Sequence, residues 1–263
     1  MTNQDIRFVD GAAYERYMGQ WSQRVGHIFL EWLSPAPGRR WLDVGCGNGA
    51  FTELIVGRCA PVSVDGVDPS EAQLAHARGR FVPAVARFHL GSAMTLPFAD
   101  ASFDVAVMPL VIFFVPEPQQ GVNEMARVVS PGGVVSAYAW DLPGNGMPYE
   151  AMLSALRDLG FAPPMPPHPE ASSLANLRAL WTAAGLTDIR THTITVERRW
   201  HSFDAYWQTV LEAPSAGSTL ASMAPDALAR LQALLQQRLP MDDTGGITVS
   251  ARANAVAGRT HAG

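Results

Sequence analysis

Lysine is absent from this chain, and all 19 of its basic residues are arginine. A lysine Schiff base and the lysine of a P-loop are therefore excluded. The formal net charge is −5, whereas nucleic acids and anionic membranes both favour a basic surface. The composition thus argues against either of them as a partner.

Cysteine is scarce too, and long apolar runs are missing. Cys46 and Cys59 are the two cysteines, too few for a disulfide framework or a cysteine-rich metal cluster. No run approaches the ~18 apolar residues of a membrane span. The first residues lack the apolar core of a signal peptide, and the seven histidines show no metal-ligand spacing. We expect a cytoplasmic protein with no membrane span and no metal site.

The most informative stretch runs from Arg39 to Ala50, with the sequence RRWLDVGCGNGA. Its apolar half predicts a strand, and its three glycines predict a tight turn where a ligand can approach the backbone. Apolar residues then recur at helical spacing. A helix that begins behind a glycine turn directs free N–H groups at the turn, which suits an anionic group.

The glycines alone also satisfy the dinucleotide-binding pattern G-x-G-x-x-G/A, and a purely structural turn would look similar. Asp43, two residues before Gly45, favours a different site, because it extends the run to Asp-x-Gly-x-Gly-x-Gly.

A second acid, Asp68, ends the next predicted strand, Val62 to Val67, and lies 23 positions after Gly45. An acid at this end of a β-α-β unit can accept hydrogen bonds from both hydroxyls of a ribose. The alternative is a simple helix N-cap, since Asp-Pro-Ser-Glu is also a helix start signal. The glycine turn at the expected distance favours the ribose.

Further motifs follow in order along the chain. They are Tyr-x-x-x-Met-Gly-x-Trp-Ser at 14–22, the Leu-Pro-Phe run within 91–104, and Pro-Gly-Gly at 131–133 before a strand that ends Trp140-Asp141. Together with the glycine turn, they make residues 12 to 141 resemble class I S-adenosylmethionine (AdoMet) methyltransferases of the ubiquinone/menaquinone-biosynthesis-like branch (methyltransferase type 11).

The resemblance implies AdoMet as cofactor, S-adenosylhomocysteine as product, and a set of cofactor-binding residues. In the family, the acid at Asp43 orders the loop and meets the amino end of the methionine moiety, Asp68 takes the ribose, and the loop at 92–94 contacts the adenine. Ser92 departs from the family pattern, in which an Asp is common. The predicted cofactor-binding residues are Tyr14, Asp43, Gly45, Cys46, Gly47, Asp68, Pro69, Ser92, Ala93, Met94, Met108 and Pro109.

The fold that the resemblance implies is a single α/β domain over 1–263. It would be a Rossmann-like, mostly parallel seven-stranded sheet of order 3-2-1-4-5-7-6, with the last strand antiparallel and helices on both faces. We expect a lid helix at 12–33, an AdoMet-binding core at 39–141 and a helical cap at 201–243 inserted between the last two strands. Pro109 to Val115 is expected to continue the fourth strand, and a helix is expected from about Met147 to Leu159.

The predicted activity is transfer of a methyl group to a small-molecule acceptor, in a monomer or homodimer. A general base is needed only if the acceptor must lose a proton. Tyr14, Asp141, His168 and His201 are candidates, and none stands out. Two alternatives remain: an NAD(P)-dependent oxidoreductase, which leaves Asp43 and the later motifs unexplained, and a non-catalytic AdoMet-binding module.

Aromatic residues suggest where the acceptor binds. They fall in three segments that the family fold would bring to one rim, and they predict a small, substantially apolar or aromatic acceptor. Core packing is the competing explanation for each. The residues are Tyr14, Trp21, Trp140, Phe203, Tyr206 and Trp207.

Overall fold

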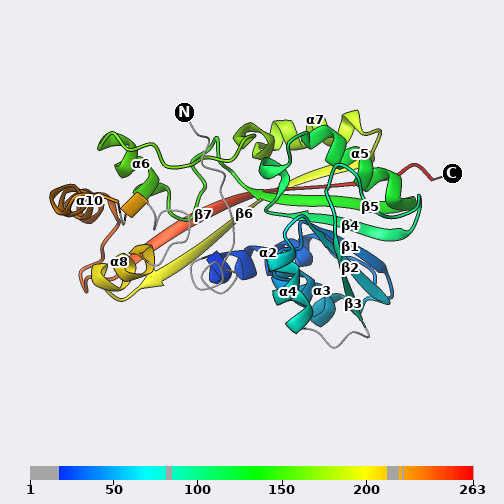
Figure 1. The fold of residues 1–263 in the computed structure, drawn as a ribbon, viewed down its shortest axis with the longest axis horizontal. Helices are drawn as coiled ribbons and strands as arrows, with labels where there is room; N and C mark the ends of the chain where they lie inside the picture. Colours follow the sequence, from blue (N-terminus) through cyan, green and yellow to red (C-terminus); the bar gives the residue numbers. More distant parts are fainter. Residues whose placement is uncertain (1–17, 81–84, 212–218, 221, 263) are drawn as a thin grey trace.

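The computed structural model describes residues 18–80, 85–211, 219–220 and 222–262. A seven-stranded sheet lies at its centre, in the order β3-β2-β1-β4-β5-β7-β6 (Figure 1). This is the predicted order, which is therefore confirmed. The strands are β1 (Arg40–Val44), β2 (Ser63–Asp68), β3 (Ala86–Leu90), β4 (Phe103–Pro109), β5 (Val129–Trp140), β6 (Thr187–Trp200) and β7 (Ile247–Arg259).

The direction of the strands decides where ligands can bind. Strands β1 to β5 pair in parallel, and β7 is antiparallel to both β5 and β6. The carboxyl ends of the first four strands therefore meet at one edge of the sheet, which is where open α/β sheets bind their ligands.

Helices cover both faces of the sheet, with α5 and α7 on one face and α2, α3 and α4 on the other (Figure 1). The elements are α2 (Gln20–Leu33), α3 (Ala50–Cys59), α4 (Glu71–Arg80), α5 (Pro118–Val128), α6 (Glu150–Asp158), α7 (Leu174–Ala183), α8 (Phe203–Leu211) and α10 (Pro225–Arg238), with short 3-10 helices η2 (Ile112–Phe114) and η3 (Pro169–Ser172). In α2, Trp21, Val25 and Phe29 are fully buried. Their spacing of four residues forms one apolar stripe, which packs the helix on the sheet.

Two predicted elements differ from the structure. The fourth strand does not continue to Val115: it ends at Pro109, Leu110 takes a left-handed conformation with φ of 59°, and η2 follows. The left-handed residue breaks the strand pleat and turns the chain away from the sheet. The helix expected from Met147 begins instead at Glu150. Of the predicted lid helix, residues 12–17 lie outside the described residues.

The last two strands project beyond the sheet. The β5–β7 pairing ends at Trp140 and Ala253, whereas β6 stays paired to β7 as far as Trp200 and Ile247. Residues 195–200 of β6 therefore extend past the carboxyl edge by roughly 20 Å at ~3.3 Å per residue. Helices α6, α8 and α10 gather around this extension (Figure 1). Within the described ranges, no helix is long and apolar enough to cross a membrane.

Candidate active site

The glycine loop follows β1 and is held against the end of β2. The N–H groups of Gly45 and Cys46 both donate to the Val67 carbonyl, at 2.7 and 3.1 Å. Gly45, Gly47 and Gly49 all have positive φ, at 74°, 52° and 80°, a conformation that glycine adopts without strain. The loop then leads into α3, whose first N–H groups have no partner within the helix.

Two of these glycines differ in what surrounds them. A Cβ at Gly45 would lie 2.5 to 3.1 Å from the side chain of Val111, so this position has no room for another side chain. A Cβ at Gly47 would have nothing within 4 Å. Gly47 therefore borders open space at the mouth of the loop, where a ligand can approach the backbone closely.

Asp43 is a buried acid with an incomplete set of hydrogen bonds. It is fully buried, and its Oδ2 accepts a hydrogen bond from the Thr52 hydroxyl at 2.7 Å. Its Oδ1 has no hydrogen-bond partner among the described residues. Burial raises the pKa of Asp43 to about 7; the Thr52 hydrogen bond opposes the rise and the charge of Asp68 adds to it. A buried polar atom without a partner is costly, so this oxygen suits a donor from a ligand or a bound water.

Asp68 ties the loop to the end of β2. Its Oδ2 accepts from the Gly47 N–H at 3.0 Å, and its Oδ1 accepts from the Ser70 N–H at 2.8 Å. Burial raises the pKa of Asp68, and the two backbone hydrogen bonds oppose that rise. The alternative prediction for Asp68 is a helix N-cap. The capping hydrogen bond is made by Ser70, whose hydroxyl accepts from the Gln73 N–H at 3.4 Å. Each Asp68 oxygen has a second lone pair, which leaves capacity for two further donors.

The predicted adenine loop is fixed by an ion pair on α5. Arg127 donates to the carbonyls of Leu96 and Phe98 and to both carboxylate oxygens of Glu124. Glu124 also accepts from the Leu96 N–H at 2.8 Å. The Ser92 hydroxyl forms a hydrogen bond within its own loop, where it accepts from the Met94 N–H at 3.2 Å. Ala93 and Met94 remain half-buried.

Four strand ends therefore converge on one site. The register aligns Val44 with Val67, Asp43 with Val107, and Asp68 with Leu90, so the segments after these strands are neighbours. The remaining predicted residues differ in exposure. Cys46 is buried, with a pKa raised well above the usual value mainly by burial; Met108 and Pro109 are buried at the end of β4; Pro69 is exposed; and Tyr14 lies outside the described residues.

Three of the catalytic candidates, Asp141, His168 and His201, lie within the described residues. Asp141 is paired with Arg252 at 2.8 Å and also accepts from the Gly144 N–H. His168 is near the segment after β4, since its backbone N–H donates to the Phe113 carbonyl at 3.1 Å. Its imidazole ring contacts the Glu170 carboxylate. His201 is exposed at the far end of the β6 extension. Among the described residues, none of the three has a hydrogen bond to the glycine loop.

Apart from Tyr14, which lies outside the described residues, the aromatic residues expected at the acceptor rim are buried, and several pack on one another. Trp21 and Tyr206 are fully buried, and Trp140 is only 2% exposed. Trp21 packs edge-on against Tyr149 with ring centroids 6.3 Å apart, and both Trp21 and Tyr206 contact Trp200. Core packing therefore explains these residues better than an open rim does.

The sequence did not predict three contacts at this site: that of Val111 with Gly45, that of Thr52 with Asp43, and the ion pair between Glu124 and Arg127. Val111 closes over Gly45 because β1 and β4 are neighbours in the sheet. No local pattern around position 111 indicates such a contact. Thr52 stands nine residues after Asp43, and only the turn between them brings their side chains together.

Comparison with known proteins agrees with this geometry. Residues 42–137 match the family model described as a methyltransferase domain. An uncharacterized methyltransferase of Mycobacterium leprae is 41% identical over 108 residues, covering 40% of this chain and 39% of that protein. The ubiquinone/menaquinone biosynthesis C-methyltransferase of Roseobacter denitrificans is 36% identical over 108 residues, covering 40% and 43%. The matches thus span about two fifths of these relatives.

A solved structure extends the likeness of the fold beyond that segment. The phosphoethanolamine N-methyltransferase 2 of Haemonchus contortus, in complex with phosphomonomethylethanolamine and S-adenosylhomocysteine, superposes with a TM-score of 0.59 at 19% identity. The superposition covers 95% of this chain and 56% of that one. Residues 42–137 of this chain are therefore similar in sequence to a methyltransferase domain, and the chain shares the seven-stranded fold of this solved methyltransferase.

Proposed function

We propose that this protein transfers a methyl group from AdoMet to a small-molecule acceptor. The observation that carries the proposal is the pair of acids at the glycine loop, where Gly47 borders open space: Asp43 has an unpartnered buried oxygen, and Asp68 has lone pairs available for further donors. A cofactor with a cationic amino end and a ribose diol matches that set of groups.

The residues fit AdoMet in the following way. Asp68 would accept the ribose hydroxyls, and the loop with Asp43 would hold the methionine end. The half-buried segment Ser92–Met94, fixed through Arg127, would border the adenine. The bound cofactor supplies a methyl group already activated by its sulfonium. The work left to this chain is to align the acceptor for in-line displacement and to exclude water.

The topology disfavours the dehydrogenase alternative. Dinucleotide-binding sheets of the doubly wound type have the strand order 3-2-1-4-5-6, whereas here an antiparallel β7 is inserted between β5 and β6. The Haemonchus relative is described in complex with S-adenosylhomocysteine, which supports AdoMet as the cofactor for this chain too.

We place the acceptor beside the segment that follows β4. Val111 covers Gly45, and the next residues form η2, whose Phe113 carbonyl accepts from His168 N–H. Phe114 is partly buried and Phe113 packs against it with ring centroids 4.7 Å apart. Apolar and aromatic surface next to the loop supports an acceptor that is small and substantially apolar or aromatic.

Calorimetry and a turnover assay test the proposal. The parent protein should bind S-adenosylhomocysteine, and Asp68→Ala should weaken binding strongly. Asp104→Ala, which removes a carboxylate at the opposite edge of the same sheet, should leave the affinity unchanged. Incubation with methyl-labelled AdoMet and fractions of a metabolite extract should give labelled product. Binding without any transfer across all fractions would instead identify a non-catalytic AdoMet-binding module.

A further inference from the structure

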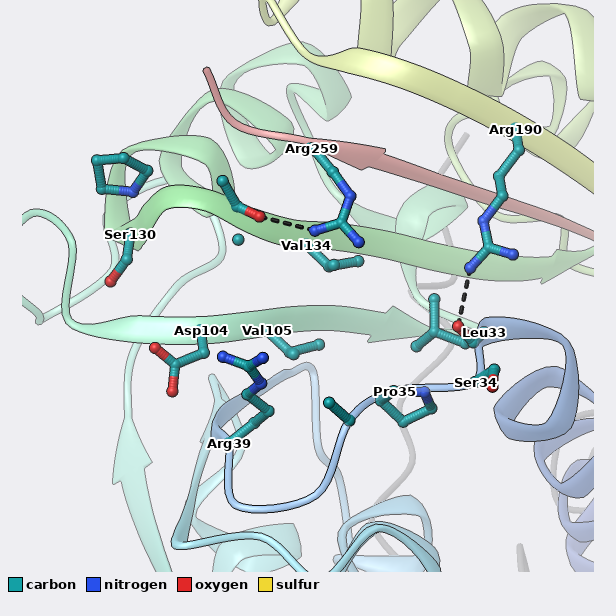
Figure 2. Close-up of a pocket in the computed structure, with 14 residues that line it drawn as sticks. Leu33, Ser34, Pro35, Arg39, Asp104, Val105, Ser130, Val134, Arg190 and Arg259 are labelled. Carbon is teal, nitrogen blue, oxygen red and sulfur yellow. Dashed lines mark hydrogen bonds between the residues drawn. The ribbon is translucent and has the colours of Figure 1, made fainter. Parts of the chain in front are cut away.

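A pocket of about 180 Å³ lies at the amino-terminal edge of the sheet, opposite the glycine loop. The segment before β1, the first residues of β4 and β5, and the last residue of β7 surround it (Figure 2). Its volume corresponds to roughly six water molecules at ~30 Å³ each. The pocket therefore suits a small ligand and is too small for a nucleotide.

The charge of the lining is positive although the chain as a whole is acidic. Arg39, Arg190 and Arg259 line the pocket, together with a single acid, Asp104. That acid is already neutralised. Arg40 holds both of its carboxylate oxygens, with Nη2 at 2.8 Å from Oδ1 and both Nε and the backbone N–H on Oδ2. Arg39 is near enough to contribute to the lowered pKa of Asp104, but among the described residues it donates no hydrogen bond to that carboxylate. The pocket therefore holds three arginines against one acid.

Two of the three guanidinium groups have donors to spare. Within the described ranges, no hydrogen bond or ion pair engages the side chain of Arg39. Arg259 uses Nη1 alone, for the Gly132 carbonyl at 2.8 Å, which leaves Nε and Nη2. Arg190 is held by its bonds to the carbonyls of Trp32 and Leu33, at 3.1 and 2.8 Å, and contributes a fixed charge.

Arg39 and Arg259 reach the pocket from different segments of the chain. Figure 2 shows Arg39 and Arg259 on opposite sides of the pocket, with Val105 and Val134 between them. Like charges around one small pocket repel, although these side chains are exposed and water screens part of the repulsion. An anion between them removes the repulsion and gains charge-assisted hydrogen bonds from both sides, for which the planar guanidinium fork is well shaped.

We propose that this pocket binds a phosphate group, either as inorganic phosphate or as the phosphate end of a small monoester. A phosphate monoester near neutral pH carries about −1.5 to −2 charges and presents three acceptor oxygens. It therefore matches two guanidinium groups on opposite sides better than a single carboxylate does. The site is separate from the AdoMet site, since β1 runs from Arg40 at this edge to Val44 at the glycine loop.

Calorimetric titration at neutral pH and low ionic strength tests this site in the full chain. The probes are inorganic phosphate and glycerol 3-phosphate, with sodium chloride at matched ionic strength as the blank. We expect saturable binding with one ligand per chain. Arg39→Gln and Arg259→Gln should each weaken it about tenfold or more, the loss of at least one charge-assisted contact. Arg230→Gln, which removes an exposed arginine of α10, is the matched control and should bind as the parent does.

The outcomes separate the two sources and can overturn the proposal. Equal affinity for both probes identifies free phosphate as the ligand, and tighter binding of glycerol 3-phosphate identifies a phosphorylated metabolite. Heats no larger than those of chloride would refute the site. So would undiminished phosphate binding in both pocket variants, or an equal loss in Arg230→Gln. S-adenosylhomocysteine affinity should stay at the parent value in all three variants, which confirms that they fold.

Discussion

As the pH rises, the free energy of unfolding of the cofactor-free Asp43→Asn variant should increase relative to that of the parent protein. In the folded protein the pKa of Asp43 is raised from 3.8 to about 7, chiefly by burial. The fold therefore favours the protonated acid. Its contribution to stability is fully present below pH ~4 and is lost as the pH rises through about 7. Asparagine has no such titration.

The magnitude follows from the pKa shift. Between pH 5 and pH 7 the unfolded chain is ionised at this position while the folded protein still holds the proton. Each pH unit in that window costs the parent about 1.4 kcal/mol relative to the variant. The stability difference should therefore move by about 3 kcal/mol in favour of Asp43→Asn between pH 5 and pH 8. A constant offset of ~1–3 kcal/mol against the variant is expected as well, because the new amide N–H₂ would occupy the position of Oδ1, which has no partner among the described residues.

Urea unfolding of both proteins at several pH values between 5 and 8, without cofactor, measures this change directly. The control is Asp104→Asn. Arg40 lowers the pKa of Asp104, so the stability that this ion pair provides is present above the unfolded pKa and is lost only as the pH falls below about 4. Its stability difference from the parent should thus stay constant over the same range. A constant difference for Asp43→Asn would refute the reasoning that burial keeps this acid protonated.

Three further predictions concern cofactor binding and are read by calorimetry with S-adenosylhomocysteine. Asp68→Ala should lower the affinity by roughly one to three orders of magnitude, since up to two charge-assisted hydrogen bonds of ~1.5–3 kcal/mol each are lost; an unchanged affinity would remove the ribose assignment. Gly47→Val should abolish binding, whereas Gly160→Val, with a similar positive φ and equally open surroundings, should retain it; equal losses would mean that backbone strain and not the ligand's space is responsible. Arg127→Gln should reduce stability by ~1–3 kcal/mol and weaken binding, because the adenine loop loses its anchor; parent-like affinity and stability would show that the loop needs no such anchor.

Local sequence was sufficient to predict the glycine turn. The turn at Gly45, Gly47 and Gly49 depends on backbone conformations with positive φ, which glycine adopts readily. The residue type alone therefore predicts the turn. Asp68 could be placed for a related reason, since a β-α-β unit of fixed length brings the end of its second strand beside the first turn. The strand order also followed from the sequence, through motifs that occur in the family's order.

Contacts between distant segments were decided by the tertiary structure. Val111 meets Gly45 only because β4 pairs beside β1, and the left-handed Leu110 that turns the chain there has no marker in the sequence. The aromatic residues show the same limit. A tryptophan such as Trp21 looks the same in the sequence whether it lines a ligand pocket or packs in the core. Only its contacts with Trp200 and Tyr149 in the structure distinguish the two roles. Likewise, Arg39 and Arg40 are adjacent in the chain and alike in chemistry. Asp104, brought in by β4, pairs with Arg40 and leaves Arg39 at the pocket.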